Sequence, residues 1–278
     1  MGKDNLVKPV VQWAGGKRQL LNTIRPLLPK NVNKYCEPFL GGGAVFFDLQ
    51  PKKAILNDVN GDLMRVYRVI RDNVNELIKT LEQFENTPEM FYRVRDWDKN
   101  RQAYESRSDV EKAARVIYLN RTCFRSLYRV NKAGQFNTPF GYRKNPNIVN
   151  APVLRAVSDY FNASDITFST VDFASGLQNI DTDTFVYFDP PYDPITKTSN
   201  FTGYTQGGFT KSDQIRLRKC CDELNRRGVR FMLSNSATDF IKEQYSAYNI
   251  TVIQARRDIN RIVNKRNDVS EVIIRNYE

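Results

Sequence analysis

Residues 184–193 read TFVYFDPPYD, an apolar run that stops at a carboxylate followed by two prolines and a tyrosine. The first five residues have the β-branched and aromatic composition of a buried strand, which places Asp189 at the carboxyl end of that strand. The two prolines prevent the backbone from continuing as a strand or starting a helix at once. Because open α/β sheets bind ligands at this edge, the stretch predicts a sheet with a stiff loop at its ligand site.

A glycine-rich turn points to the same edge of the sheet. The stretch EPFLGGGAVF, residues 37–46, has three glycines between a predicted strand at 35–39 and a predicted helix at 44–49, and glycine lets the backbone approach a ligand closely. A second predicted strand at 54–56 is followed by Asp58, a carboxylate placed to accept hydrogen bonds from ribose hydroxyls. Since the glycine spacing is not GxGxxG, an adenosine-containing cofactor fits better than a dinucleotide.

The rest of the chain predicts an α/β pattern with an insertion. After WAGGK, residues 13–17, apolar spacing predicts an amphipathic helix that ends at Pro29, and further helices are expected at 61–71 and 212–227. Helical patterns run from 74 to 119 without a strand, and an irregular basic stretch follows to 150, which interrupts the alternation. The later strands are predicted at 166–171, 184–188, 229–234, 250–255 and 269–274, the last two as an antiparallel pair.

The positive charge of the chain is concentrated in this insertion. The 278 residues include 42 Lys and Arg against 31 Asp and Glu, a net charge of +11. Residues 91–145 hold thirteen basic and five acidic side chains, with aromatic residues interleaved. Cations together with aromatic rings suit the phosphates and bases of a nucleic acid. The alternative is a solvated basic face above ordinary core aromatics.

Several classes of chemistry are excluded by composition. The chain has no histidine, and its four cysteines (Cys36, Cys123, Cys220 and Cys221) have no CxxC spacing. The usual zinc sites, histidine-based triads and imidazole bases are therefore absent, and no metal is predicted. No window has the length and apolarity of a signal peptide or a membrane span. We expect an intracellular protein with reduced thiols and no membrane partner.

The order of residues after the strand at 184–188 suits one reaction in particular. An exocyclic amine on a nucleobase is a poor nucleophile, because its lone pair is delocalised into the ring. The Asp189 carboxylate and the Pro190 carbonyl could accept hydrogen bonds from both amine protons and stabilise the positive charge that develops during attack. Tyr192 would provide a flat ring on which the base stacks.

Five stretches in the same order resemble one family across nearly the whole chain. They are WAGGK at 13–17, EPFLGGGAVFFDL at 37–49, LND at 56–58, DPPY at 189–192 and LSNS at 233–236. This set is similar to the Dam-type (D12 class, group alpha) DNA adenine-N6 methyltransferases, including the GATC-specific methyltransferases of restriction systems. The resemblance implies a catalytic motif made of Asp189, Pro190, Pro191 and Tyr192. It implies that S-adenosylmethionine is bound by Trp13, Lys17, Phe39, Gly41, Gly43, Asp58, Asp172, Phe173 and Asp189.

The insertion carries a second part of the resemblance. NRTCFRSLYRVNKAGQFNTPFG, residues 120–141, is similar to the family's target-recognition segment, in which an arginine reads a guanine and an aromatic residue fills the stack left by a flipped adenine. These roles would fall to Arg129 and Phe124. The implied DNA-binding residues are Phe124, Arg125, Leu127, Arg129, Asn131, Lys132, Pro139, Tyr142 and Arg143.

Two departures from the family pattern lie in this same segment. The family often has Asn-Gly where this chain has Arg125 and Ser126, and Gly-Arg-Tyr where this chain has Gly141, Tyr142 and Arg143. They leave the recognition sequence open but not the reaction. TSNFTGYTQGGFT at 198–210 resembles the segment that closes over the target base, and the basic stretch 255–266 is expected to be a solvated edge.

The resemblance implies a Rossmann-like, seven-stranded mixed sheet of the class I S-adenosylmethionine-dependent methyltransferases with an inserted helical DNA-recognition subdomain. The catalytic domain would comprise residues 1–73 and 153–278, and the target-recognition domain residues 74–152. The predicted function is transfer of a methyl group from S-adenosylmethionine to N6 of a flipped adenine in duplex DNA, with GATC as the expected site. No covalent enzyme intermediate is expected, since none of the four cysteines follows a proline as in cytosine-C5 methyltransferases.

Two alternatives stay open from the sequence. One is an RNA base methyltransferase with the same catalytic motif, and the large basic insertion counts against it. The other is a regulator that binds cofactor and DNA without catalysis, and the intact Asp189 to Tyr192 motif counts against it. The expected partners are double-stranded DNA and a cognate restriction endonuclease acting on the same site. The expected location is the cytoplasm of a bacterial or phage-infected cell, on the nucleoid.

Overall fold

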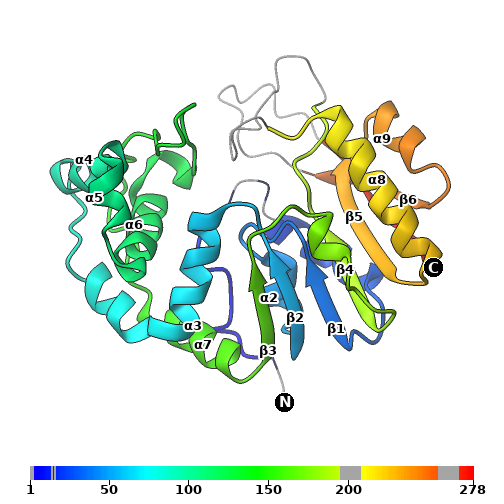
Figure 1. The fold of residues 1–278 in the computed structure, drawn as a ribbon, viewed down its shortest axis with the longest axis horizontal. Helices are drawn as coiled ribbons and strands as arrows, with labels where there is room; N and C mark the ends of the chain where they lie inside the picture. Colours follow the sequence, from blue (N-terminus) through cyan, green and yellow to red (C-terminus); the bar gives the residue numbers. More distant parts are fainter. Residues whose placement is uncertain (1–2, 14, 16, 195–207, 256–268) are drawn as a thin grey trace.

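A single mixed sheet of seven strands forms the centre of the molecule (Figure 1). The computed structural model describes residues 3–13, 15, 17–194, 208–255 and 269–278. The strand order is β3-β2-β1-β4-β5-β7-β6; β3, β2, β1, β4 and β5 are parallel, and β7 is antiparallel to both of its neighbours. The bounds are β1 Lys34–Glu37, β2 Lys53–Asn57, β3 Asp165–Ser169, β4 Thr184–Phe188, β5 Arg230–Ser236, β6 Asn249–Ala255 and β7 Val269–Arg275. The predicted seven-stranded mixed sheet is confirmed, including the antiparallel pair at its end.

The alternation of side chains along the strands divides the core between the two faces of the sheet. In β4, which is buried at every residue, Phe185 and Tyr187 belong to one apolar cluster, and Val186 and Phe188 belong to another. Because successive strand residues point to opposite faces, both faces must be covered by helices, as in other parallel sheets. One face carries α2 (Ala44–Leu49), α3 (Gly61–Leu81) and α7 (Ala151–Asn162); the other carries η5 (Ser175–Leu177), α8 (Lys211–Arg226) and α9 (Asp239–Gln244).

The segment expected as a single amphipathic helix ending at Pro29 is instead three short turns. They are the 3₁₀ turn η1 (Lys17–Leu20), the single α-turn α1 (Leu21–Ile24) and the 3₁₀ turn η2 (Arg25–Leu27). Pro26 has no N–H to donate to the preceding turn, which prevents a continuous α-helix through this position. The predicted helical segment is therefore present and ends before Pro29, but only its central turn is α-helical.

The predicted helical insertion contains α4 (Pro88–Arg95), η3 (Asp96–Lys99), α5 (Arg101–Glu105), α6 (Asp109–Thr122) and η4 (Phe124–Ser126), which lie to the left of the sheet in Figure 1. Helix α6 starts with a capping box between Ser108 and Glu111. The proposed boundary between 73 and 74 falls inside α3, at a kink where Asn73 has non-helical angles of φ −139° and ψ 37°.

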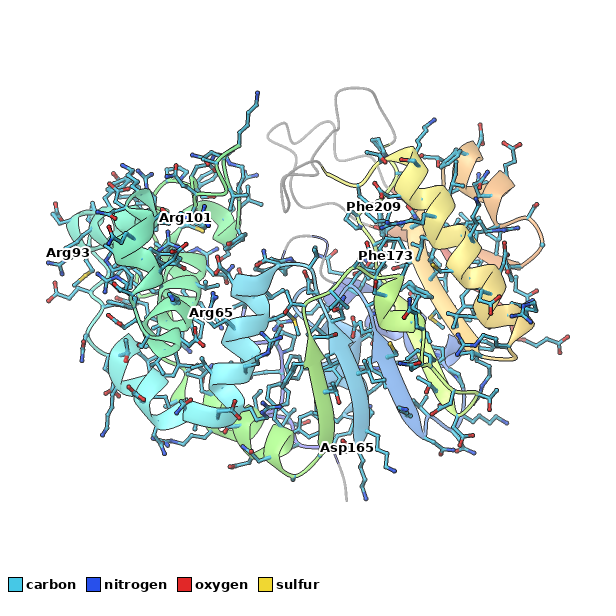
Figure 2. The ribbon with its side chains drawn as sticks, viewed as in Figure 1. Arg65, Arg93, Arg101, Asp165, Phe173 and Phe209 are labelled. Atoms are coloured by element: carbon cyan, nitrogen blue, oxygen red, sulfur yellow. The ribbon has the colours of Figure 1, made fainter. Side chains whose placement is uncertain are left out.

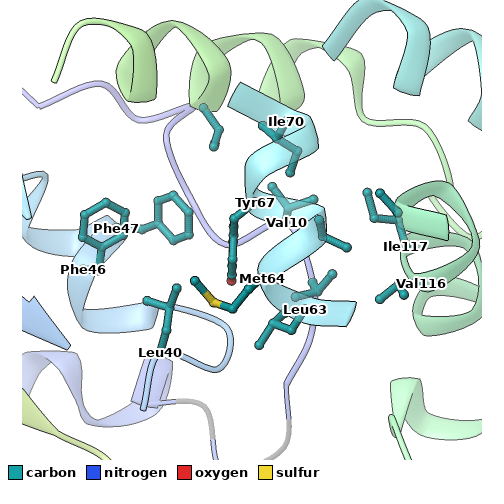
Figure 3. Close-up of a cluster of buried hydrophobic side chains, with 14 of the residues drawn as sticks. Val10, Leu40, Phe46, Phe47, Leu63, Met64, Tyr67, Ile70, Val116 and Ile117 are labelled. Atoms are coloured by element: carbon teal, nitrogen blue, oxygen red, sulfur yellow. The ribbon is translucent and has the colours of Figure 1, made fainter. Parts of the chain in front are cut away.

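One apolar cluster connects the sheet to these helices. Figure 3 shows Leu63, Tyr67 and Ile70 of α3 with Phe46 and Phe47 of α2 on one side and Val116 and Ile117 of α6 on the other. Helix α3 therefore packs against both the sheet side and α6. Among the described residues, no helix combines the length and apolarity needed to cross a bilayer.

Candidate active site and nucleic-acid interface

The sheet topology brings the two sequence motifs together. Strand β1 lies between β2 and β4, with Cys36 opposite Val186 in the parallel register. The glycine loop that follows β1 and the DPPY loop that follows β4 therefore leave the same edge of the sheet from neighbouring strands. This edge is where open α/β sheets bind ligands.

Asp189 lies at the carboxyl end of β4, where two donors meet one of its oxygens. The Lys17 ammonium lies 2.7 Å from Oδ1, and the Ser234 hydroxyl donates to the same oxygen at 3.0 Å. The Lys17 side chain is 5% exposed and also donates to the carbonyl of Gly15 at 2.7 Å. Within the described part of the chain no donor meets Oδ2 of Asp189, so this oxygen is an available acceptor.

Tyr192 is held at both its face and its hydroxyl. The Lys17 ammonium lies 4.5 Å from the centre of the ring, a distance typical of a cation–π contact. The hydroxyl donates to Oε2 of Glu271 at 2.9 Å. Burial raises the pKa of the Tyr192 phenol well above its ordinary value of 10.0, and the negative charges of Asp189 and Glu271 raise it further. The phenol therefore stays protonated and remains a donor.

Buried side chains from β5 and α8 hold the loop that carries these residues. Gln214 donates to the carbonyl of Pro191 at 2.9 Å, and Asn235 accepts from the N–H of Asp193 at 3.0 Å. Asn235 also donates to Gln214 at 3.1 Å, so the two braces support each other. Among the described residues no donor meets the carbonyl of Pro190, which therefore remains an available acceptor beside Asp189.

The glycine loop is fixed by the carboxylate at the end of β2. Asp58 accepts from the N–H of Gly41 at 2.9 Å and from the N–H of Asn60 at 2.9 Å. Gly41 has a φ of +49°, and a Cβ added there would lie 3.0 Å from Cδ1 of Trp13. Burial raises the pKa of Asp58 above its ordinary value of 3.8. Asp58 thus shapes the loop, in addition to any role toward a ribose.

Aromatic rings gather beside this loop. Phe39 lies 5.2 Å from Phe173 and 5.7 Å from Phe209, measured between ring centres. Figure 2 shows Phe173 and Phe209 near one another at the carboxyl edge, opposite the edge marked by Asp165. Arg216 covers Phe173, with its Cζ 4.4 Å from the ring centre, and pairs with Asp172 at 2.6 Å.

Trp13 connects this edge with the recognition segment. Its ring stacks on Tyr128, with the centres 4.9 Å apart and the planes 27° apart. Asn120, fully buried near the end of α6, accepts from the N–H of Gln12 at 2.9 Å and donates to its carbonyl at 2.7 Å. The segment that carries Trp13 is thereby attached to the helical side of the molecule.

The recognition segment, residues 120–141, together with Tyr142 and Arg143 that follow it, folds back on itself with little regular structure. Phe124 donates its N–H to the carbonyl of Pro139 at 2.9 Å, and isolated bridges join Cys123 to Phe140 and Val130 to Phe136. The Phe124 side chain is 46% exposed and that of Tyr142 is 74% exposed. Large exposed aromatics in a basic segment suit stacking on bases.

The predicted base reader is oriented by a neighbouring amide. Nε of Arg129 donates to Oδ1 of Asn137 at 2.7 Å. Asn131 accepts from the N–H groups of Ala133 and Gln135, so it shapes the turn of the segment. Of the other predicted DNA contacts, Leu127 and Arg143 are half-buried, whereas the exposed ones are Arg125, Lys132 and Pro139.

Sequence reasoning assigned no role to Glu37, Gln214 or Glu271. Glu37 is 2% exposed and accepts from the Tyr35 hydroxyl at 2.8 Å. Burial raises the pKa of this carboxyl well above its ordinary value of 4.5; the Tyr35 bond lowers it, and the charges of Asp189 and Asp58 raise it. The available signal was a polar residue inside an apolar pattern: Glu37 ends the strand KYCE, Gln214 lies on the buried face of α8, and Glu271 interrupts VSEVIIR.

Two predicted features lie wholly or partly outside the described residues. Of the segment 198–210 only Gly208, Phe209 and Thr210 are described, and of the basic stretch 255–266 only Ala255 is described. In the part of the chain that is described, no group of three or more cysteine, aspartate or glutamate side chains could hold a metal ion. Burial raises the pKa values of the Cys36, Cys123 and Cys221 thiols, which makes them poor nucleophiles.

Comparison with known proteins agrees with this geometry. Residues 13–259 match the family described as D12 class N6 adenine-specific DNA methyltransferase. The chain is 42% identical over 273 residues to the type II methyltransferase M1.LlaDCHI of Lactococcus lactis subsp. cremoris, which covers 98% of this chain and 96% of that protein. It is 42% identical over 292 residues to the type II methyltransferase M.MjaIII of Methanocaldococcus jannaschii, with 98% and 99% covered. It is 31% identical over 267 residues to a DNA adenine methylase of Escherichia coli strain K12, with 95% and 93% covered.

Proposed function

Since this chain belongs to the D12 class of N6 adenine-specific DNA methyltransferases, we propose that it methylates a flipped adenine in duplex DNA at GATC, with S-adenosylmethionine as the donor. The observation that carries the proposal is the arrangement at the end of β4. Among the described residues no donor meets Oδ2 of Asp189 or the Pro190 carbonyl, which leaves both as acceptors in the loop that carries Tyr192. Two acceptors and a stacking ring are what an exocyclic amine on a base requires.

The residues of this site activate the amine by position rather than by deprotonating it first. Hydrogen bonds to Asp189 and Pro190 draw the nitrogen toward tetrahedral geometry and stabilise the positive charge that develops on it. A strong base is not needed, because the amine proton becomes acidic only as the new bond forms. This accounts for catalysis by a chain without histidine. A covalent protein intermediate is not part of the mechanism, since the three buried cysteine thiols are poor nucleophiles.

The glycine-loop edge fits S-adenosylmethionine, which supplies an electrophilic methyl group. Gly41 has a φ of +49°, and a Cβ there would press on the Trp13 indole, so glycine lets this loop lie close to Trp13. Asp58 provides carboxylate oxygens for ribose hydroxyls, and Phe39 and Phe173 provide apolar rings. Val59 and Val171, 60% and 42% exposed, offer apolar surface at the same edge of the sheet. Trp13, Lys17, Gly43, Asp172 and Asp189 complete the set that we propose for the cofactor.

Target recognition is assigned to the segment 120–143. Phe124 would fill the gap left by the flipped base, and Arg129, oriented by Asn137, would read a guanine in the major groove. The other contacts are proposed to come from Arg125, Leu127, Asn131, Lys132, Pro139, Tyr142 and Arg143. In this assignment residues 74–152 form the recognition domain, and residues 1–73 and 153–278 form the catalytic domain.

Sequencing of modified bases tests the proposal directly. The chain and its Asp189→Ala variant are expressed in a bacterium that lacks adenine methylation, and the positions of N6-methyladenine are read from genomic DNA. We expect methylation confined to GATC with the parent chain and none with the variant. Methyladenine in another sequence would contradict the GATC assignment alone. Unmodified DNA together with modified RNA would contradict the proposed substrate.

The names of two relatives also bear on the partner. Both are type II methyltransferases, a class found in restriction systems. We therefore propose that this chain acts in the cytoplasm, on nucleoid DNA, and protects the site of a cognate restriction endonuclease. Plasmid from expressing cells should resist an endonuclease that adenine methylation blocks at GATC. Complete cleavage by that endonuclease would contradict the proposal.

A further inference from the structure

Glu271 is a buried carboxylate in an otherwise apolar strand. It is 8% exposed, and its neighbours Val272, Ile273 and Ile274 in β7 are fully buried. Removing a carboxylate from water is costly unless a donor meets it. Within the described part of the chain the donor is the hydroxyl of Tyr192, at 2.9 Å. The strand therefore carries a charged side chain at a buried position where packing alone would favour an apolar one.

The antiparallel direction of β7 explains how Glu271 reaches the catalytic loop. Glu271 lies opposite Ser236 of β5 in the antiparallel register, and Ser236 is the last residue of β5. The start of β7 therefore lies at the edge where the parallel strands end. Ser236 also donates to the carbonyl of Asp193 at 2.6 Å, so this pair of strand residues borders the DPPY loop directly.

We propose that Glu271 is a positioning residue for methyl transfer, which anchors the hydroxyl end of the Tyr192 ring and increases the electron density on the face of the ring. The proposal rests on the function proposed above, in which the target base stacks on Tyr192. It adds a residue of β7, outside the sequence motifs, to the residues that determine the rate of methyl transfer.

Two features of the Tyr192 contact support this role. A hydrogen bond from a phenol to a carboxylate is charge-assisted, and it holds the ring at its far end, where a rotation of the side chain about the Cα–Cβ bond would break it. The ring already attracts a cation, because the Lys17 ammonium lies 4.5 Å from its centre. A carboxylate behind the hydroxyl strengthens this attraction. The same field favours the positive charge that develops on the base during transfer.

A variant that keeps the shape and removes the charge separates this role from structural support. Glu271→Gln retains an acceptor for the Tyr192 hydroxyl. The duplex used carries the site found by sequencing modified adenines. We expect kcat to fall about 10-fold, with the KM values for DNA and S-adenosylmethionine within about 2-fold of the parent values. Thermal unfolding of the variant should match that of the parent. Ser270→Ala, the preceding residue of β7, is the matched control and should leave kcat unchanged.

A double-mutant cycle provides the second measurement. Tyr192→Phe removes the donor, so Glu271→Gln added to it should cause little further loss of kcat. Tyr192→Phe alone leaves the buried Glu271 carboxylate without this donor, so its thermal unfolding is measured beside that of the double variant, which has no unpaired buried charge. Three outcomes would overturn the inference. The first is an equal kcat for Glu271→Gln and the parent, and the second is a loss in the double variant equal to the product of the two single losses. The third is a rise in KM without a fall in kcat. Failure of the parent chain to methylate DNA would instead overturn the proposed function.

Discussion

The catalytic edge of the sheet and the recognition segment are held in place by different means. At the catalytic edge, buried strands end at defined positions and buried side chains of β5, β7 and α8 brace the DPPY loop. In the loop 38–43 positive φ angles occur only at Gly41 and Gly43. In the recognition segment, by contrast, Arg125, Ser126 and Tyr142 have φ angles of 55°, 54° and 49° without being glycine.

This contrast shows where the chain can vary. These three residues are among those by which the sequence was expected to depart from the family resemblance, in which Asn-Gly often stands in place of Arg125 and Ser126. Non-glycine residues in the left-handed region cost local energy, but they do not disturb the sheet. The chemistry depends on strand register and buried braces. The segment proposed for reading the bases contains non-glycine residues with positive φ angles, so under that proposal specificity could change while the reaction stays the same.

The largest effect is expected from removing a buried ion pair that stabilises the helical insertion. The Arg115 guanidinium lies 2.6 Å from Asp98, and the two side chains are 2% and 12% exposed; Asp98 also accepts from the N–H of Phe136. Arg115→Ala should lower the free energy of unfolding by about 3–5 kcal/mol, because it leaves a buried carboxylate unpaired. Urea denaturation measures the change.

The matched control for Arg115 is an exposed pair in the same region. Arg101 and Glu105 are also close, at 2.7 Å, but are 90% and 63% exposed. Arg101→Ala should lower the free energy of unfolding by less than about 1 kcal/mol. Similar losses of unfolding free energy in the two variants would show that burial is not the reason why the Arg115 pair stabilises the fold.

At the catalytic edge, Glu37 should make stability depend on pH. Its folded pKa lies above its ordinary value of 4.5. Below that pH the carboxyl is protonated in both states. Above it, the unfolded chain loses the proton first, so stability falls by up to about 1.4 kcal/mol per pH unit until the folded pKa is passed.

Glu37→Gln imitates the protonated carboxyl and should remove this decline. Urea denaturation of parent and variant from pH 4 to pH 8 measures the difference. The variant should become increasingly more stable than the parent as the pH rises. Parallel curves across this range would contradict a raised pKa for Glu37.

Base discrimination tests the reading surface without affecting the catalytic edge. Arg129→Ala should lose about 1–3 kcal/mol of discrimination at one base pair, because a guanidinium bonds two acceptors of guanine. Lys132→Ala should instead weaken binding to all sequences alike and flatten the salt dependence. Binding to cognate and altered duplexes at several salt concentrations measures both. An unchanged ratio in Arg129→Ala would exclude it as the reader.

The smallest change in stability is expected from a substitution that relieves backbone strain in the same segment. Ser126 has a φ of 54°, and among the described residues its buried hydroxyl has no hydrogen-bond partner. Ser126→Gly should raise the free energy of unfolding by about 1 kcal/mol, since the relief of strain exceeds the entropy cost of glycine. Thermal unfolding measures the change. Ser158→Gly, in the right-handed helix α7, should lower stability by about the same amount. A loss in both variants would show that Ser126 is not strained.

Much of the catalytic edge could be predicted from local patterns. A fully buried strand such as β4 is recognisable from its composition, and its end placed Asp189 correctly at the sheet edge. The sequence did not show whether the glycine loop and the DPPY loop are neighbours; the structure shows that β1 and β4 pair in parallel. The helical segment before Pro29 was predicted, but not its 3₁₀ ends, because apolar spacing gave no weight to Pro26 within it. Glu271 was missed, because a lone acid in a strand has no spacing that indicates a partner.

The sequence by itself determined the positions of the strands, the glycine turn and the reaction, because these follow from short-range composition and from motifs that lie within a few residues. Only the tertiary structure decided which side chains meet. Ser234 is hydrogen-bonded to Asp189, 45 residues away in the sequence, and Glu271 is hydrogen-bonded to Tyr192, 79 residues away. Such contacts depend on the strand order and on the antiparallel direction of β7. Because these are properties of the whole sheet, no local stretch of sequence specifies them.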